Sequence, residues 1–185
     1  MIDELIQDAV RRMDRSVEAT LGEFNTVRTG RASAALLDRI HVDYYGTPTP
    51  LKQLATINVP EPRMLTIQPF DPTSLKAIEK AIQESDLGLT PSNDGKVIRL
   101  PIPQLTEERR KELVKVVRHL AEEGRIAVRN VRRDAMHHLK ELVDNGDVGA
   151  DEEHRAEDRV QKLTDEHIHK IDDLLKRKEA EIMEV

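Results

Sequence analysis

Apolar and small side chains recur every three or four residues between positions 105 and 143, which predicts one long helix with a single buried stripe. Thr106 can cap this helix, and two glutamates follow in its first turn, where the helix dipole favours negative charge. Asn145-Gly146 predicts its end, because glycine adopts the left-handed conformation without steric cost. The expected buried stripe is Leu113, Val117, Leu120, Gly124, Ala127, Val131, Ala135, Leu139 and Leu142.

The same spacing predicts two further helices, one over residues 2–28 and one over 151–184. Gly30 marks the end of the first, and Asp151 can cap the other. None of the three helices can bury its apolar stripe alone, so we expect both ends of the chain to form a three-helix bundle. The outer two stripes are Ile2, Ile6, Ala9, Met13, Val17, Leu21 with Thr20, Phe24 and Val27, and then Ala156, Val160, Leu163, Ile171, Leu174 and Met183.

Residues 31–104 follow a different pattern, in which seven prolines between positions 48 and 91 separate short apolar runs. Strands are predicted at 40–45, 55–59, 64–70 and 97–100, with one short helix at 74–85.

The predicted fold class is therefore α+β. A discontinuous bundle domain (1–30 and 105–185) would carry an inserted, small α/β-sandwich-like domain (31–104). The two connecting segments form a possible hinge, whose residues are Gly30, Arg31, Pro103 and Gln104.

Charge separates the long helix from the rest of this 185-residue chain, whose net charge is -6. Residues 105–140 hold 10 Lys/Arg against 6 Asp/Glu, whereas residues 141–185 hold 7 against 15. Aromatic residues make up only 2% of the chain, so the core must be aliphatic and the long helix cannot offer a stacking platform for single-stranded bases. A nucleic acid would have to be gripped through its backbone and shape.

Arginines form a second stripe on the long helix, with members Arg118, Arg125, Arg129 and Arg132. At about 100° per residue they fall within an arc of about 60°, which we expect to lie away from the apolar stripe, and they span about 21 Å. Arg133 flanks the row, and only Glu122 lies among its members. The row is typical of an electrostatic footprint for phosphates. The alternative is a solvated face whose arginines pair with a neighbouring acidic helix.

Catalytic and metal-binding patterns are weak in this sequence. The absence of cysteine excludes disulfides and thiolate chemistry and fits a reducing compartment. No nucleophile elbow occurs, and no histidine pair flanks a glutamate at metalloprotease spacing, so we expect no enzyme, no metal and no cofactor. We expect the histidines at surface or boundary positions; they are His41, His119, His137, His138, His154, His167 and His169.

The N-terminus is acidic where a signal peptide needs basic residues, and no apolar run approaches the about 18 residues that span a bilayer. We therefore expect a cytoplasmic protein without membrane association. Two other classes stay open on these patterns: a helical protein-interaction or chaperone-like module, and a hydrolase on the α+β domain that would need a pocket with acid and base groups.

Five stretches together carry a family resemblance: residues 28–33 (RTGRAS), 44–51 (YYGTPTPL), 105–111 (LTEERRK), 125–135 (RIAVRNVRRDA) and 161–165 (QKLTD). In this order and spacing they resemble the bacterial ribosome recycling factors over essentially the whole chain. The resemblance implies an L-shaped, two-domain monomer that enters the ribosome after termination. It implies that elongation factor G and GTP act with it to split the subunits and free messenger RNA and deacylated transfer RNA.

The resemblance also implies partners for each part of the chain. The bundle would lie against large-subunit ribosomal RNA on the inter-subunit face, and the smaller domain would face the small subunit and elongation factor G. GTP hydrolysis would belong to the elongation factor. Together with the arginine row, the resemblance makes Arg129 and Arg132 the central candidates for ribosomal RNA binding, with Arg110, Arg118, Arg125 and Arg133 in support. Arg28 and Arg31 are second candidates, whose alternative role is to cap or tie the connecting segments.

Overall fold

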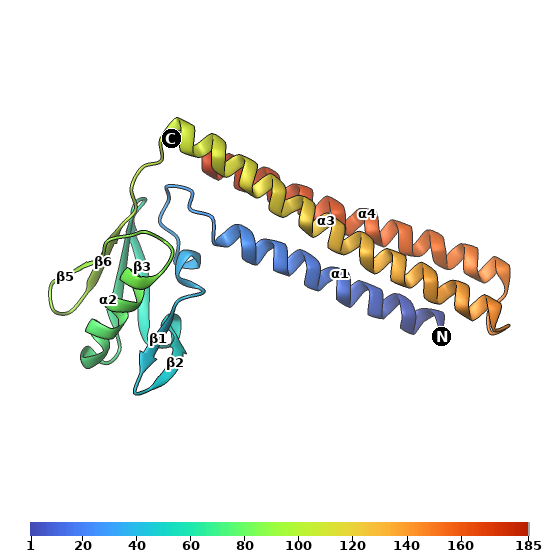
Figure 1. Ribbon diagram of the computed structural model, residues 1–185, viewed down its shortest axis with the longest axis horizontal. Helices are drawn as coiled ribbons and strands as arrows, with labels where there is room; N and C mark the ends of the chain where they lie inside the picture. Colours follow the sequence, from blue (N-terminus) through green and yellow to red (C-terminus); the bar gives the residue numbers. More distant parts are fainter. Residues whose placement is uncertain (185) are drawn as a thin grey trace. The chain divides into compact units, whose positions relative to one another are not determined.

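The computed structural model describes residues 1–184, and the chain divides into two compact units. One unit comprises Met1–Phe24 with Glu112–Ala180, and the other comprises Asn25–Lys111 with the described residues from Glu181 onward. The first unit consists of helices, and both sheets belong to the second (Figure 1). This confirms the predicted α+β class, in which helices from both ends of the chain pack together and a small β-sheet unit lies between them in sequence.

Three long helices run side by side: α1 (Ile2–Asn25), α3 (Glu107–Asp144) and α4 (Ala150–Met183) (Figure 1). Each has the bounds expected from its pattern to within a few residues. Asp151 lies in the first turn of α4 instead of capping it, because the helix already begins one residue earlier. Within residues 1–184, none of the helices is both long and apolar enough to cross a bilayer.

Local signals set both ends of α3. The backbone N–H of Arg109 donates to Oγ1 of Thr106 at 3.1 Å, which is the predicted N-cap. At the other end, Gly146 adopts a φ of 77° and its N–H donates to the carbonyl of Val143 at 2.9 Å. The next N–H along the chain bonds to the Leu142 carbonyl, which completes a Schellman turn.

The bundle core follows the predicted stripes in part. Leu21 on α1 is exposed, and Ile2, Val17, Leu120, Ala127 and Leu142 are half-buried, whereas Ala121 and Val128 of α3 are buried although they were not predicted. Two polar residues of α4 also belong to the core. Thr164 and His167 are buried there, whereas Leu163 and Leu174 are half-buried and Met183 is exposed. The buried positions are Ile6, Ala9, Met13, Thr20 and Phe24 on α1, Leu113, Val117, Ala121, Gly124, Val128, Val131, Ala135 and Leu139 on α3, and Ala156, Val160, Thr164, His167 and Ile171 on α4.

His167 corrects the expectation that the histidines occupy surface or boundary positions, because its ring is only 3% exposed. Nδ1 lies 2.7 Å from the carbonyl oxygen of Leu163, and Nε2 lies 2.7 Å from Oδ1 of Asp14 on α1. Both partners are hydrogen-bond acceptors, and the ring lies between them. The polar ring thereby ties α4 to α1, and the other six histidines are exposed as predicted.

All three helices approach one another at Gly124. A Cβ at this position would overlap Oγ1 of Thr20 on α1 and lie 3.2 Å from Cδ1 of Ile171 on α4. Rotating Thr20 gives only partial relief, because its Cβ itself lies 3.3 Å away and the rotation breaks the 2.9 Å hydrogen bond from Oγ1 to the carbonyl of Ser16.

We therefore expect Gly124→Ala to lower the free energy of unfolding by about 2 kcal/mol, although alanine is the better helix former. Urea denaturation followed by circular dichroism measures this change. Gly22→Ala on α1 is the control: nothing lies within 4 Å of its Cβ, so it should stabilise the fold slightly. Equal effects at both glycines would contradict the close packing at Gly124.

The second unit combines two antiparallel sheets with one α-helix. The sheets are a β1–β2 hairpin and a four-stranded sheet of order β3-β4-β6-β5. The strands are β1 (His41–Tyr44), β2 (Thr47–Pro50), β3 (Ala55–Glu61), β4 (Met64–Pro69), β5 (Ser92–Asn93) and β6 (Ile98–Pro101). The helix is α2 (Leu75–Glu84), and short 3-10 helices cover Ala34–Leu37, Leu51–Gln53 and Pro72–Ser74.

An aliphatic core joins these elements. Ile78 and Ile82 of α2 are fully buried in it, together with Leu65 and Ile67 of β4 and Val42 of β1. The hairpin turns at Tyr45 and Gly46, whose φ values are 50° and 80°. Strand β2 was not predicted, because its two prolines indicate a break; a proline can nevertheless occupy a strand that is paired on one side only.

Candidate nucleic-acid interface

The arginine row of α3 lies along the seam with α4, beside the buried stripe. Arg118 donates from Nε to Oε1 of Glu179 at 2.7 Å, and this hydrogen bond raises the pKa of Arg118 above its ordinary value. Arg125 contacts Asp172, which, like Glu179, lies on α4. The expectation that the row lies away from the apolar stripe, with few acidic partners, is therefore wrong for these two residues. A helical wheel of one helix shows the angle between side chains but not where its neighbour packs.

Arg125 is the most fully engaged member of the row. Its Nε and one terminal nitrogen lie 2.8 and 2.7 Å from Oδ1 of Asp172, and its other terminal nitrogen lies 3.0 Å from Oε2 of Glu122. The side chain is only 19% exposed. With all three guanidinium nitrogens occupied, Arg125 ties α3 to α4 and has little capacity left for a ligand.

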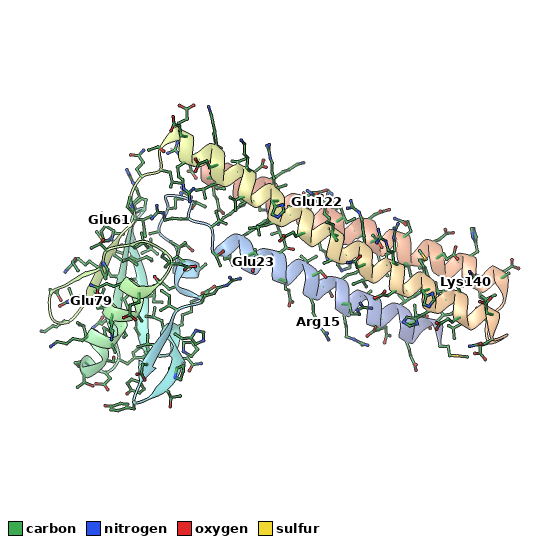
Figure 2. The ribbon with its side chains drawn as sticks, viewed as in Figure 1. Arg15, Glu23, Glu61, Glu79, Glu122 and Lys140 are labelled. Atoms are coloured by element: carbon green, nitrogen blue, oxygen red, sulfur yellow. The ribbon has the colours of Figure 1, made fainter. Side chains whose placement is uncertain are left out.

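Arg129 shares the carboxylate of Glu122 with Arg125, at 3.3 Å from Oε1. Figure 2 marks Glu122 on α3, on the side of the bundle where α4 lies beside it. Hydrogen bonding, first from Arg125 and then from Arg129, holds the pKa of Glu122 below its ordinary value. Arg129 uses one N–H in this contact and retains the others.

Arg132 has an uncharged partner. One terminal nitrogen donates to Oε1 of Gln161 on α4 at 3.1 Å, and Nε2 of Gln161 donates in turn to Oδ1 of Asp165 at 3.0 Å. The amide holds the guanidinium in place without cancelling its charge. Arg133 is exposed, and no residue between 1 and 184 offers it a hydrogen bond or an ion pair.

The structure therefore divides the six predicted arginines into groups. Arg129, Arg132 and Arg133 lie within two turns of α3 and keep N–H donors for a ligand. Charge-assisted, bidentate contacts from guanidinium groups suit phosphate oxygens. Arg118 and Arg125 lie on the same flank but are paired with carboxylates of α4.

Arg110 is not part of this cluster. It belongs to the second unit, and its Nε is buried without a hydrogen-bond partner among residues 1–184. Its helical phase coincides with the buried stripe and not with the arginine row, because it precedes Leu113 by three positions.

The four predicted hinge residues all lie inside the second unit. Gly30 has a φ of 81° and its Cβ position faces the side chain of Leu105. Arg31 pairs with Glu184 at 2.7 Å, and Gln104 accepts a hydrogen bond from Arg63 at 3.1 Å. The nearby Arg28 donates to the carbonyl of Leu87 at 3.5 Å.

Sequence reasoning did not find the α4 residues that meet the arginines. A signal was present: Asp165, Asp172 and Glu179 are spaced by seven residues, which places them on one flank of α4. Arg118, Arg125 and Arg132 have the same spacing on α3. Two helices joined by a short turn pack antiparallel, so these two series face one another in reverse order.

Known proteins are similar to this chain in sequence and in fold. A family model described as "Ribosome recycling factor" matches residues 21–183. The ribosome-recycling factor of Rubrobacter xylanophilus is 60% identical over 180 residues, 97% of each chain. That of Geobacillus kaustophilus is 56% identical over 185 residues, the full length of both.

Two solved structures are also similar. One, described as the solution structure of the ribosome recycling factor, is 46% identical with a TM-score of 0.82 and covers 100% of this chain and 98% of its own. The other is described as models for the T. thermophilus ribosome recycling factor and the E. coli elongation factor G bound to the E. coli post-termination complex. It is 49% identical, with a TM-score of 0.71, and both chains are covered completely.

Proposed function

The chain belongs to the ribosome recycling factor family, and on this premise we propose that it binds the post-termination ribosome and acts there with elongation factor G and GTP. Together they separate the subunits, so that messenger RNA and deacylated transfer RNA leave. The proposal is supported by the relative described with elongation factor G on a post-termination complex, which matches this chain over its full length.

The observation that carries the docking step is the cluster of Arg129, Arg132 and Arg133. We propose that these three side chains bind phosphates of large-subunit ribosomal RNA on the inter-subunit face. Arg118 supports them with the N–H groups that Glu179 leaves free, and Arg125 acts by holding α4 in place. The scarcity of aromatic residues fits this mode, because backbone phosphates need charge and not stacking platforms.

The remaining roles follow from the same premise. The chain acts as a cytoplasmic monomer without a cofactor of its own, and GTP hydrolysis occurs on elongation factor G. Residues 31–104 form the inserted domain, and Gly30, Arg31, Pro103 and Gln104 form the hinge on which it moves. The positive φ of Gly30 supports this role, since only glycine takes that conformation at no steric cost.

Breakdown of post-termination polysomes tests the proposal. Purified polysomes are incubated with elongation factor G and GTP, with and without this chain, and subunits are separated on a sucrose gradient. We expect free subunits and released messenger RNA only when all three components are present. Polysomes that persist in the complete mixture, or that break down equally well without this chain, would reject a recycling function.

A further inference from the structure

The seam between α3 and α4 contains three regularly spaced contacts, and the third differs from the first two. Arg118 meets Glu179 and Arg125 meets Asp172, which are direct ion pairs. Continuing by seven residues in opposite directions along the two helices brings Arg132 to Asp165. At that position Gln161 intervenes: it accepts from Arg132 and donates to Asp165.

From this geometry we propose that Gln161 is a positioning residue that orients Arg132 for phosphate binding while shielding it from pairing with Asp165. The inference rests on the proposed docking of the arginine cluster on ribosomal RNA. An amide suits the role because it presents an acceptor to the guanidinium and a donor to the carboxylate at the same time. The third contact thus fixes the side chain of Arg132 and leaves its full charge available to a ligand.

A carboxylate in place of the amide would act in the opposite way. It would make Arg132 the third paired arginine of the seam, so that a phosphate would have to displace an ion pair before binding. In the first two contacts an ion pair links the helices. In the third contact an uncharged amide stands where a carboxylate could pair with Arg132. If Gln161 served only to link α3 and α4, a glutamate at this position would serve at least as well.

Gln161→Glu tests the proposal, because it changes one charge with almost no change in shape. We expect the affinity of the full chain for purified large ribosomal subunits to fall about tenfold or more in a sedimentation assay. The midpoint of urea unfolding should change little, because the ion pair gained with Arg132 is offset by repulsion between the new carboxylate and that of Asp165, which loses the N–H of Gln161. A merely structural role predicts that binding stays intact, because a glutamate at this position would still link α3 to α4.

Gln7→Glu is the matched control. Gln7 is exposed on α1, and its substitution changes the net charge by the same amount away from the seam. It should leave binding within about twofold of the wild type, since distant surface charges are screened. Binding by Gln161→Glu that equals the wild type or this control would overturn the proposal.

A double variant separates this inference from the docking proposal beneath it. In an Arg132→Gln background, Gln161→Glu should weaken binding by less than about twofold, because the charge that it cancels is already gone. If Arg132→Gln itself has no effect on binding, both the docking proposal and this inference fail. If Arg132→Gln weakens binding but Gln161→Glu does not, only the role of Gln161 is rejected.

Discussion

Arg132→Glu is expected to weaken binding to the large ribosomal subunit by about a hundredfold, since it removes one charge-assisted phosphate contact and puts a repulsive charge in its place. Arg132 is held by an uncharged amide, so its full charge is available to RNA in the wild-type chain. The fold should survive, because the side chain is half-buried at the edge of the seam and the amide of Gln161 can donate to a carboxylate there.

Sedimentation of the variant with purified large subunits measures the loss, and circular dichroism checks that helix content is retained. Arg11→Glu on α1 is the control, with the same change in net charge at an exposed position whose one ion pair within residues 1–184 is with Asp8 at 3.6 Å. It should bind within about twofold of the wild type, because exposed pairs of this kind contribute little. Equal weakening by both variants would indicate a general effect of charge and would reject a specific role for Arg132.

Helix positions could be predicted from the sequence because their signals are local. The Thr106 cap and the Gly146 turn act within a few residues of the helix ends that they define. Strand β2 was missed because the signals of Pro48 and Pro50 are also local and indicate a break. Only the pairing of Pro48 with Asp43 across the hairpin, a contact between strands, shows that this segment is extended.

The site was predicted less well, because it depends on where neighbouring helices pack. The α3 pattern alone grouped Arg129 and Arg132 with Arg125, although all three guanidinium nitrogens of Arg125 contact carboxylates. His167 was expected at a surface or boundary position for the same reason: nothing next to it in sequence indicates that Asp14 on α1 would meet its ring. Comparing the spacing of seven on the two helices would have revealed the paired seam.

Arg125→Ala should lower the stability of the fold and largely spare binding. Arg132→Glu should do the opposite: it should weaken binding and spare the fold. The substitution leaves the carboxylates of Asp172 and Glu122 without their shared partner. Both are about half-exposed, at 42% and 50%, so water replaces part of what they lose. We expect the free energy of unfolding to fall by about 2 kcal/mol, which urea denaturation can measure.

Arg133→Ala completes this comparison. Arg133 is exposed and makes no hydrogen bond or ion pair among residues 1–184, so its removal should change the free energy of unfolding by less than about 0.5 kcal/mol. Binding should respond in the reverse order: we expect about a tenfold loss for Arg133→Ala and less than about threefold for Arg125→Ala, assayed where both are folded. The two arginines carry the same charge on the same helix, and their different partners and exposure would account for such opposite effects. If both variants lose stability and binding in parallel, arginines that hold α4 and arginines that meet RNA are not distinct groups.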